Sequence, residues 1–231
     1  MTEPAAQEQS RETARQSLAD LLTNASAGQF PRADGRAEVV AQPSDRDAGV
    51  ISFTGYAVIF ADTDADWIAA QLPPGDLSGP LSATFLHALS RRLSRQTHSV
   101  DMLTCAAALA GPPQHDLGLV ELAADAGHAH ARIVRALRYR DEVRAWQAPG
   151  GVVLLGRGVA GRFEVAIEVD PACRDRGLGT RLAIAARHLV PAGWPLWAQI
   201  APANAASVRV FLAAGFRPIG AEALLSRDLP E

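Results

Sequence analysis

Arginine and glycine cluster in residues 174–179, RDRGLG, between a strand-like and a helix-like segment. Arg174, Gly177 and Gly179 form the pattern R-x-x-G-x-G. A helix N-terminus offers free backbone N–H groups and partial positive charge, and glycine lets that backbone approach a ligand closely. Residues 170–217 carry six arginines against two acidic residues. This pattern predicts a cradle for a polyphosphate; the alternative is a plain glycine-rich loop with solvated arginines.

A second segment that could take part in ligand binding or chemistry is residues 204–216, NAASVRVFLAAGF, which follows another strand-like run. Asn204 is one of only two asparagines in the chain and stands where a helix is expected to begin. Taken alone, Asn204 could be only an N-cap and Gly215 only a C-cap. The order of strand, glycine motif, helix, strand and this second motif is far more specific than either motif by itself.

The bulk composition limits the classes of function. The chain has 231 residues, a net charge of −3 and a pI of about 6.1, which argues against general nucleic-acid binding. All 22 basic residues are arginine. Two cysteines, Cys105 and Cys173, are too few for a disulfide framework and fit a reducing compartment. We find no secretory signal and no apolar run that could span a bilayer, so a cytoplasmic protein is expected.

The helices and strands that position these motifs can be predicted from hydrophobic periodicity, which indicates an α/β or α+β chain with several hairpins. Strands are predicted at 50–60, 117–123, 142–148, 151–156, 162–169, 196–200 and 219–227, and residues 100–109 are predicted as a buried strand or a short apolar segment. Helices are predicted at 65–72, 81–95, 130–140, 178–190 and 205–214, with a short helix in 8–23 and a mobile loop over 28–49.

These elements suggest three parts. Residues 1–49 are predicted as a flexible N-terminal tail. Residues 50–114 are predicted as a strand–helix–helix–strand region on the substrate side, and residues 115–231 as the domain that carries both motifs.

Several other patterns look chemical but are better explained otherwise. Residues 156–161, GRGVAG, match a dinucleotide fingerprint, yet an alternating strand follows instead of a helix, so we expect a tight hairpin turn. Residues 62–66, DTDAD, lack the later ligands of a calcium loop and are predicted as a solvated helix start. His128 and His130 diverge on a helix and predict no metal pair. Cys173 has no evident base, so a nucleophilic role is not expected.

Together, the two motifs resemble the GNAT family of acetyl-CoA-dependent N-acetyltransferases over about residues 115–229. The resemblance implies a mixed, mostly antiparallel central sheet flanked by helices. It also implies direct transfer of an acetyl group from acetyl-CoA to a primary amine of a small molecule or peptide. No metal, nucleic acid or membrane partner is implied, and a homodimer is left open.

The resemblance also implies roles for individual residues. Backbone groups of Ile167, Glu168 and Val169 would pair with the pantetheine arm like an added strand. The pyrophosphate would lie on amides of Arg174, Asp175, Arg176, Gly177, Leu178, Gly179 and Thr180. Asn204 would bond the pantetheine or a backbone group that positions it, Ser207 belongs to the same motif, and Phe211 would pack near the thioester sulfur.

The proton-transfer groups are less well defined. Glu164 and Glu168 share one face of a predicted strand, and either could be the base that deprotonates the amine; the alternative is a solvated strand face. Phe211 stands where many family members have a tyrosine that protonates the leaving thiolate. This departure favours, as the alternative function, a CoA-binding regulatory or scaffold protein with weak or no catalysis. A partner-binding role for the N-terminal half is a third hypothesis.

Overall fold

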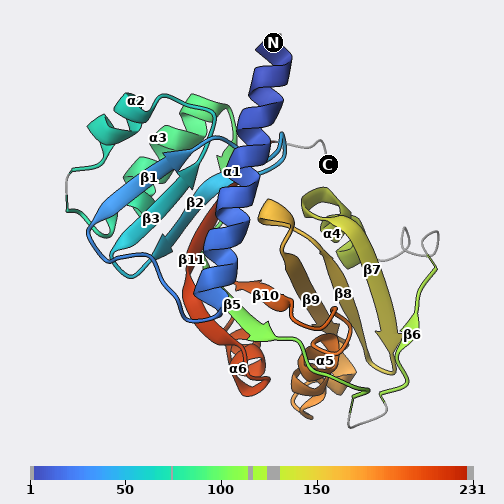
Figure 1. The fold of residues 1–231 in the computed structure, drawn as a ribbon. Coiled ribbons are helices and arrows are strands. Elements are labelled where there is room, and N and C mark those ends of the chain that lie inside the picture. The colour runs from blue at the N-terminus through green and yellow to red at the C-terminus, as the bar shows by residue number, and fades with distance from the viewer. Residues whose placement is uncertain (1–2, 74, 114–116, 124–130, 228–231) are drawn as a thin grey trace. The chain divides into compact units, whose positions relative to one another are not determined.

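The computed structural model describes residues 3–73, 75–113, 117–123 and 131–227 (Figure 1). The chain divides into two compact units. Unit 1 comprises residues 1–103 and 219–231, and unit 2 comprises residues 104–218. The predicted three-part division does not coincide with these units, because the last strand of the chain pairs within unit 1.

Unit 1 combines helices with a mixed sheet. Its helices are α1 (Glu3–Ser26), α2 (Ala65–Gln71), the 3-10 turn η1 (Gly79–Leu81) and α3 (Ala83–Leu93). Its strands are β1 (Arg36–Val40), β2 (Ala48–Phe53), β3 (Tyr56–Phe60), β4 (Gln96–Thr97) and most of β11 (Arg217–Ser226). The strand order is β1-β3-β2-β11, with β1 parallel to β3 and the other neighbours antiparallel. The short β4 pairs with the end of β11.

The core of unit 1 lies between this sheet and helices α2 and α3. It contains apolar side chains from β2, β3, α2, α3 and β11, namely Ala48, Val50, Ile59, Ala61, Ile68, Phe85, Leu86, Leu89, Ala223 and Leu225. Ser82 caps α3 by accepting a hydrogen bond from the Phe85 amide at 3.2 Å. Asp64 caps α2 by accepting a hydrogen bond from the Asp66 amide at 2.8 Å, which confirms the predicted helix start at residues 62–66.

Two predictions in this region are wrong. Residues 50–60 form a hairpin of β2 and β3 rather than one strand, because Gly55 takes a positive φ of 69° at the turn. The helix predicted within residues 8–23 is present but longer, since α1 spans Glu3–Ser26 with Leu18, Leu22 and Ala25 buried, whereas the loop predicted over 28–49 is wrong in part because it contains β1. The strand β1 pairs with β3, which lies about 20 residues later in the chain, so the local sequence does not predict it.

Unit 2 contains both motif segments. Its strands are β6 (Val120–Glu121), β7 (Asp141–Ala148), β8 (Gly151–Arg157), β9 (Phe163–Val169) and β10 (Pro195–Ile200). Its helices are α4 (Ala131–Tyr139), α5 (Leu178–Ala186) and α6 (Ala205–Ala213), with the 3-10 turns η3 (Val159–Gly161) and η4 (Pro171–Cys173). The strand β5 (Asp101–Ala107) contains the boundary between the units, and its Thr104 hydroxyl donates to the Ala198 carbonyl of β10 at 3.0 Å.

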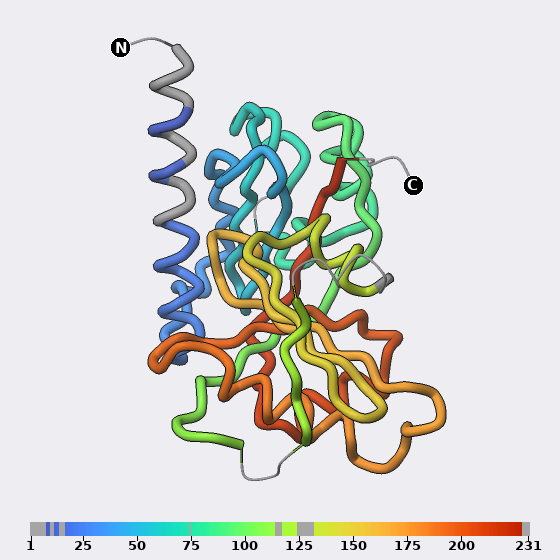
Figure 2. Tube along the Cα trace, turned by 90° about the vertical axis from the view of Figure 1, so that its right-hand side faces the viewer, coloured from blue at the N-terminus to red at the C-terminus, as the bar shows by residue number. Residues whose placement is uncertain are grey.

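The sheet of unit 2 runs in the order β10-β9-β8-β7-β6. Figure 2 shows β7, β8 and β9 doubling back on one another in yellow to orange. Neighbours are antiparallel except β9 and β10, so most strand pairs described in both units are antiparallel. The turn predicted at residues 156–161 joins β8 to β9, which confirms a hairpin there.

Helices cover both faces of this sheet. On β8, Val152 and Leu154 pack with Ile133 of α4, whereas a Cβ on Gly151 would lie 2.8 Å from Leu182 of α5. Alternate residues of a strand point to opposite faces, so α4 and α5 lie on opposite sides. Within the part of the chain that the structure describes, no helix combines the length and apolar character needed to cross a membrane.

Candidate active site

The parallel strands β9 and β10 pair only at one end. Their register contains Leu196 opposite Phe163 and Trp197 opposite Glu164. In contrast, β8 pairs with β9 along its whole length, from Arg157 opposite Phe163 to Gly151 opposite Val169. Among the described residues, the β9–β10 ladder therefore ends at Glu164, and the remainder of that edge of β9 is left unpaired by β10.

The backbone groups that face this edge can be identified from hydrogen-bond alternation. The Asp170 amide donates to the Gly150 carbonyl at 2.8 Å, so the backbone of Asp170 faces the β8 side. Alternate residues of an antiparallel strand face opposite neighbours. Ile167 and Val169 therefore present their backbone groups to the unpaired edge, whereas Glu168 faces β8. A Cβ on Gly151 would lie 2.7 Å from the Glu168 carbonyl oxygen, which agrees.

The glycine motif follows directly after β9. η4 leads to a loop in which Asp175 and Gly177 both have positive φ, 60° and 74°, and α5 begins at Leu178. No side chain caps this helix start, and a Cβ on Gly177 would meet nothing within 4 Å. Gly179 differs, because its Cβ would lie 3.2 Å from a methyl group of Val210 in α6. Gly177 therefore borders open space, and Gly179 permits close helix packing.

The other residues of this motif are open to solvent. Arg174, Asp175 and Arg176 are exposed, Thr180 is half-buried, and Leu178 is buried. The Arg174 Nε donates to the Val169 carbonyl at 3.2 Å. The structure thus brings the predicted pyrophosphate segment to the end of β9 that β10 does not pair.

The second motif forms the start and core of α6. The Asn204 Oδ1 accepts a hydrogen bond from the Ser207 amide at 3.0 Å, so the N-cap interpretation is confirmed. Phe211 is buried and meets Phe216 edge-to-face, with ring centroids 4.9 Å apart. These contacts explain both residues structurally; their roles toward a ligand stay predictions.

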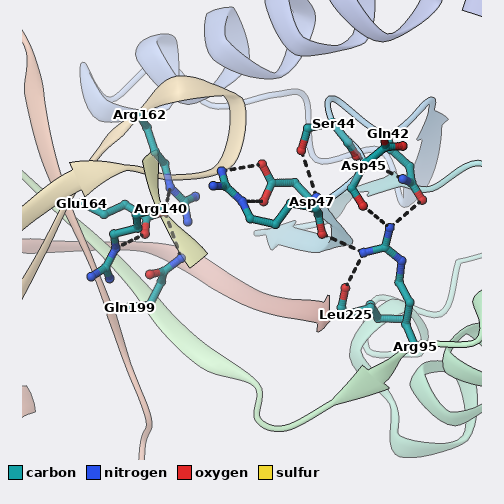
Figure 3. A network of polar contacts seen from close by, with 11 residues as sticks. Gln42, Ser44, Asp45, Asp47, Arg95, Arg140, Arg162, Glu164, Gln199 and Leu225 are labelled. Carbon is teal, nitrogen blue, oxygen red and sulfur yellow. Dashed lines mark hydrogen bonds and ion pairs between the residues drawn. The ribbon is translucent and has the colours of Figure 1, made fainter. Parts of the chain in front are cut away.

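Glu164 lies in a buried ionic network rather than on a solvated face (Figure 3). Its carboxylate accepts hydrogen bonds from the Nε atoms of Arg140 and Arg162, each at 2.8 Å, and from Gln199 at 3.2 Å. Burial raises the pKa of the Glu164 carboxyl, but the two guanidinium groups more than offset this, and the pKa lies below its usual range. A carboxylate held in this way is a weak proton acceptor.

Glu168 is more accessible. Its carboxylate pairs with the Nε of Arg132 in α4 at 2.6 Å, and both side chains remain about 40% exposed, at 41% for Arg132 and 40% for Glu168. Because Glu164 and Glu168 alternate with residues that pack toward α5, both lie on the α4 face of the sheet. Of the two predicted bases, the geometry favours Glu168.

The arginines that hold these carboxylates are not among the predicted site residues. Arg162 could have been found, since it is two residues from Glu164 on the same face of the chain. Arg140 and Arg132 come from 24 and 36 residues away, and no local signal links them to β9.

In unit 1, the Tyr56 hydroxyl donates to Glu38, and burial with this bond raises the pKa of Tyr56.

Among the described residues, no group of three or more His, Cys, Asp or Glu side chains is arranged to hold a metal ion. His128 and His130 lie outside the described residues. Cys173 is half-buried, and burial raises the pKa of the Cys105 thiol to about 11.

Residues 162–224 match the family model described as FR47-like protein, which is GNAT-related. This segment is therefore similar to a GNAT-related family. The match runs from the start of β9 into β11 and therefore contains both motifs and the β9–β10 divergence. The mixed, mostly antiparallel sheet flanked by helices agrees with the fold that the sequence predicts.

Solved structures of GNAT proteins are similar to this chain only at low sequence identity. A GCN5-related N-acetyltransferase from Kribbella flavida is 17% identical, with a TM-score of 0.42 over 63% of this chain and 64% of its own. A putative GNAT acetyltransferase from Novosphingobium aromaticivorans is 20% identical, with a TM-score of 0.41 over 58% and 68%. A GNAT acetyltransferase from Colwellia psychrerythraea is 8% identical, with a TM-score of 0.39 over 62% and 63%.

The chain thus spans less than two thirds of the length of the Kribbella and Colwellia proteins. A comparison with curated proteins gives no match.

Proposed function

We propose that the protein is an N-acetyltransferase that transfers an acetyl group from acetyl-CoA to a primary amine of a small molecule or peptide. The observation that carries this proposal is the unpaired edge of β9, which begins after Glu164 and ends beside the glycine motif. An extended pantetheine arm has amides that can bond the backbone of Ile167 and Val169 as a neighbouring strand would.

The loop before α5 fits a pyrophosphate. The open space at Gly177 and the uncapped helix start leave backbone N–H groups accessible to an anion. The exposed side chains of Arg174, Arg176 and Arg181 add positive charge around the same turn. A side chain at position 177 would occupy this space.

Acetyl-CoA would supply the activated acyl thioester, and the protein must manage the proton of the attacking amine. Glu168 is the better base because it remains accessible, whereas Glu164 is buried between two guanidinium groups. An ammonium group near Glu168 can lose its proton to this carboxylate directly or through water. A backbone N–H near Val169 can stabilise the developing oxyanion.

The departing thiolate needs no strong acid. Phe211 has no proton to donate, but a thiol has a pKa of about 8.5, so a thiolate is a tolerable leaving group at neutral pH. We therefore expect turnover that does not depend on a tyrosine at this position. The same phenylalanine also favours a second candidate function, a CoA-binding regulatory or scaffold protein with weak or no catalysis.

The first test is calorimetric titration of acetyl-CoA into the wild type and Gly177→Glu. We expect the carboxylate to repel the pyrophosphate and weaken binding by at least about tenfold. Gly193→Glu is a matched control in unit 2: Gly193 also has a positive φ, 85°, with nothing within 4 Å of an added Cβ. It precedes the paired end of β10, so its binding should match the wild type. No binding by the wild type would overturn the proposal.

Catalysis is then separated from binding with an amine panel and release of free thiol as the readout. Acetyl transfer to an amine supports the enzyme, whereas tight binding without transfer across the panel supports the regulatory alternative. Glu168→Gln should lower kcat by about a hundredfold or more and leave the affinity for acetyl-CoA nearly unchanged. An unchanged kcat would remove Glu168 as the base.

A further inference from the structure

Arg174 makes a contact that the glycine motif itself does not require. Its side chain is exposed, yet its Nε donates a hydrogen bond to the Val169 carbonyl at 3.2 Å. The bond reaches back over η4 to the last residue of β9. A guanidinium that served only as a solvated charge would not need this partner.

The Val169 carbonyl belongs to the edge of β9 that β10 leaves unpaired. The Asp170 amide faces Gly150 on the β8 side, so the backbone groups of Val169 face the opposite way. This carbonyl is the acceptor nearest the glycine motif that a strand-like ligand could use. Arg174 therefore occupies the position that a ligand amide would take.

We propose that Arg174 is a removable cap on the binding edge. It covers the Val169 carbonyl in the free protein and moves to the ligand phosphates when acetyl-CoA binds. This inference rests on the proposed function. The exchange is favourable because a guanidinium forms stronger, often bidentate bonds with a charged phosphate than with a neutral carbonyl.

The cap has opposite effects on the two halves of the ligand. For the pantetheine half, Arg174 competes for the Val169 carbonyl, so its removal should strengthen binding. For the phosphate half, Arg174 supplies charge, so its removal should weaken binding. A residue that only stabilised the loop or only attracted phosphate could not produce effects of opposite sign.

The experiment compares Arg174→Ala with the wild type and with Arg176→Ala, which removes another exposed arginine of the same loop. The probes are S-acetylpantetheine, 3′-phosphoadenosine 5′-diphosphate and acetyl-CoA, titrated separately and followed by protein amide NMR signals. We expect Arg174→Ala to bind S-acetylpantetheine about three- to tenfold more tightly, the range of one net hydrogen bond. It should bind the diphosphate more weakly, and Arg176→Ala should leave S-acetylpantetheine binding unchanged.

A second readout observes the cap directly. The Nε–H signal of Arg174, assigned by its loss in Arg174→Ala, should shift when S-acetylpantetheine is added to the wild type. Thermal unfolding of the variant should match the wild type, because the side chain is exposed.

Two results would overturn the inference, and they are distinguishable. If the wild type binds acetyl-CoA but Arg174→Ala binds S-acetylpantetheine equally or more weakly, the cap is wrong and the proposed function survives. If the wild type binds neither acetyl-CoA nor either fragment, the proposed function fails and the cap fails with it.

Discussion

Each unit buries an arginine, and the two are neutralised in different ways (Figure 3). Arg95 in unit 1 is 6% exposed and Arg162 in unit 2 is 5% exposed. Arg95 donates to the backbone carbonyls of Arg46, Asp45 and Leu225, at 2.7, 2.7 and 3.0 Å. Arg162 instead donates to the carboxylate of Glu164. Arg95 thus bonds to neutral carbonyls with the charges of Asp45, Asp47 and Asp62 nearby, whereas Arg162 bonds directly to a carboxylate.

The two units also differ in overall charge. Unit 1 has nine arginines against 16 acidic residues, and unit 2 has 13 arginines against nine. In the acidic unit the buried arginine bonds to carbonyls and has acidic residues nearby, whereas in the basic unit it bonds directly to a buried carboxylate. Arg95 thus joins the loop before β2 to β11, whereas Glu164 fixes β9 at the point where its pairing with β10 ends.

The largest effect is expected for Glu164→Ala. It leaves Arg140 and Arg162 buried without their shared carboxylate, and breaking a buried pair costs about 3–5 kcal/mol. Urea unfolding should show this loss, and hydrogen exchange should locate it in β8 and β9. A change in the free energy of unfolding below about 1 kcal/mol would contradict this, because it would mean that water reaches Arg140 and Arg162 or that the network rearranges to compensate.

Arg95→Ala should have the next largest effect. It removes the donors of several hydrogen bonds from a buried charged group, and such bonds contribute about 1.5–3 kcal/mol each before relaxation. We expect a loss of about 2–3 kcal/mol, with faster hydrogen exchange in residues 42–47. Arg91→Ala, on the exposed side of α3, is the control and should stay within about 0.5 kcal/mol. Equal stability of both variants would contradict the structural role of Arg95.

The pH dependence of unfolding separates the two centres further. The pKa of Glu164 is lowered in the folded state, so its contribution is complete above the unfolded glutamate pKa of about 4.3 and is lost as pH falls through the folded pKa. Glu164→Gln should therefore differ from the wild type by a constant amount at neutral pH, and the difference should shrink below about pH 4. The bonds of Arg95 go to carbonyls, which do not titrate, but the nearby carboxylates of Asp45, Asp47 and Asp62 also favour its charge. Arg95→Ala should therefore change the acid slope less than Glu164→Gln does, and an equal change would contradict this account.

The sequence predicts the local features of unit 2 well and the long-range features poorly. The alternation of residues 151–156 and 162–169, with turn residues between them, predicts β8 and β9 to within one residue. The helix predicted over 178–190 ends earlier, at Ala186. The exposure of Glu168 fits a strand face, but the burial of Glu164 depends on Arg140, which is 24 residues away. No period within β9 distinguishes these two glutamates.

The smallest effect is expected where the pair is exposed. Glu168→Ala breaks the ion pair with Arg132, but water screens both side chains, and exposed pairs contribute about 0–1 kcal/mol. The free energy of unfolding should therefore change by less than about 1 kcal/mol, against several for Glu164→Ala. High salt should reduce the change further, because exposed pairs are screened. If Glu168→Ala proved as destabilising as Glu164→Ala, Glu168 would be a structural group rather than an accessible base. A small stability change together with a lost acetyl transfer rate would assign the two glutamates to different tasks on one strand.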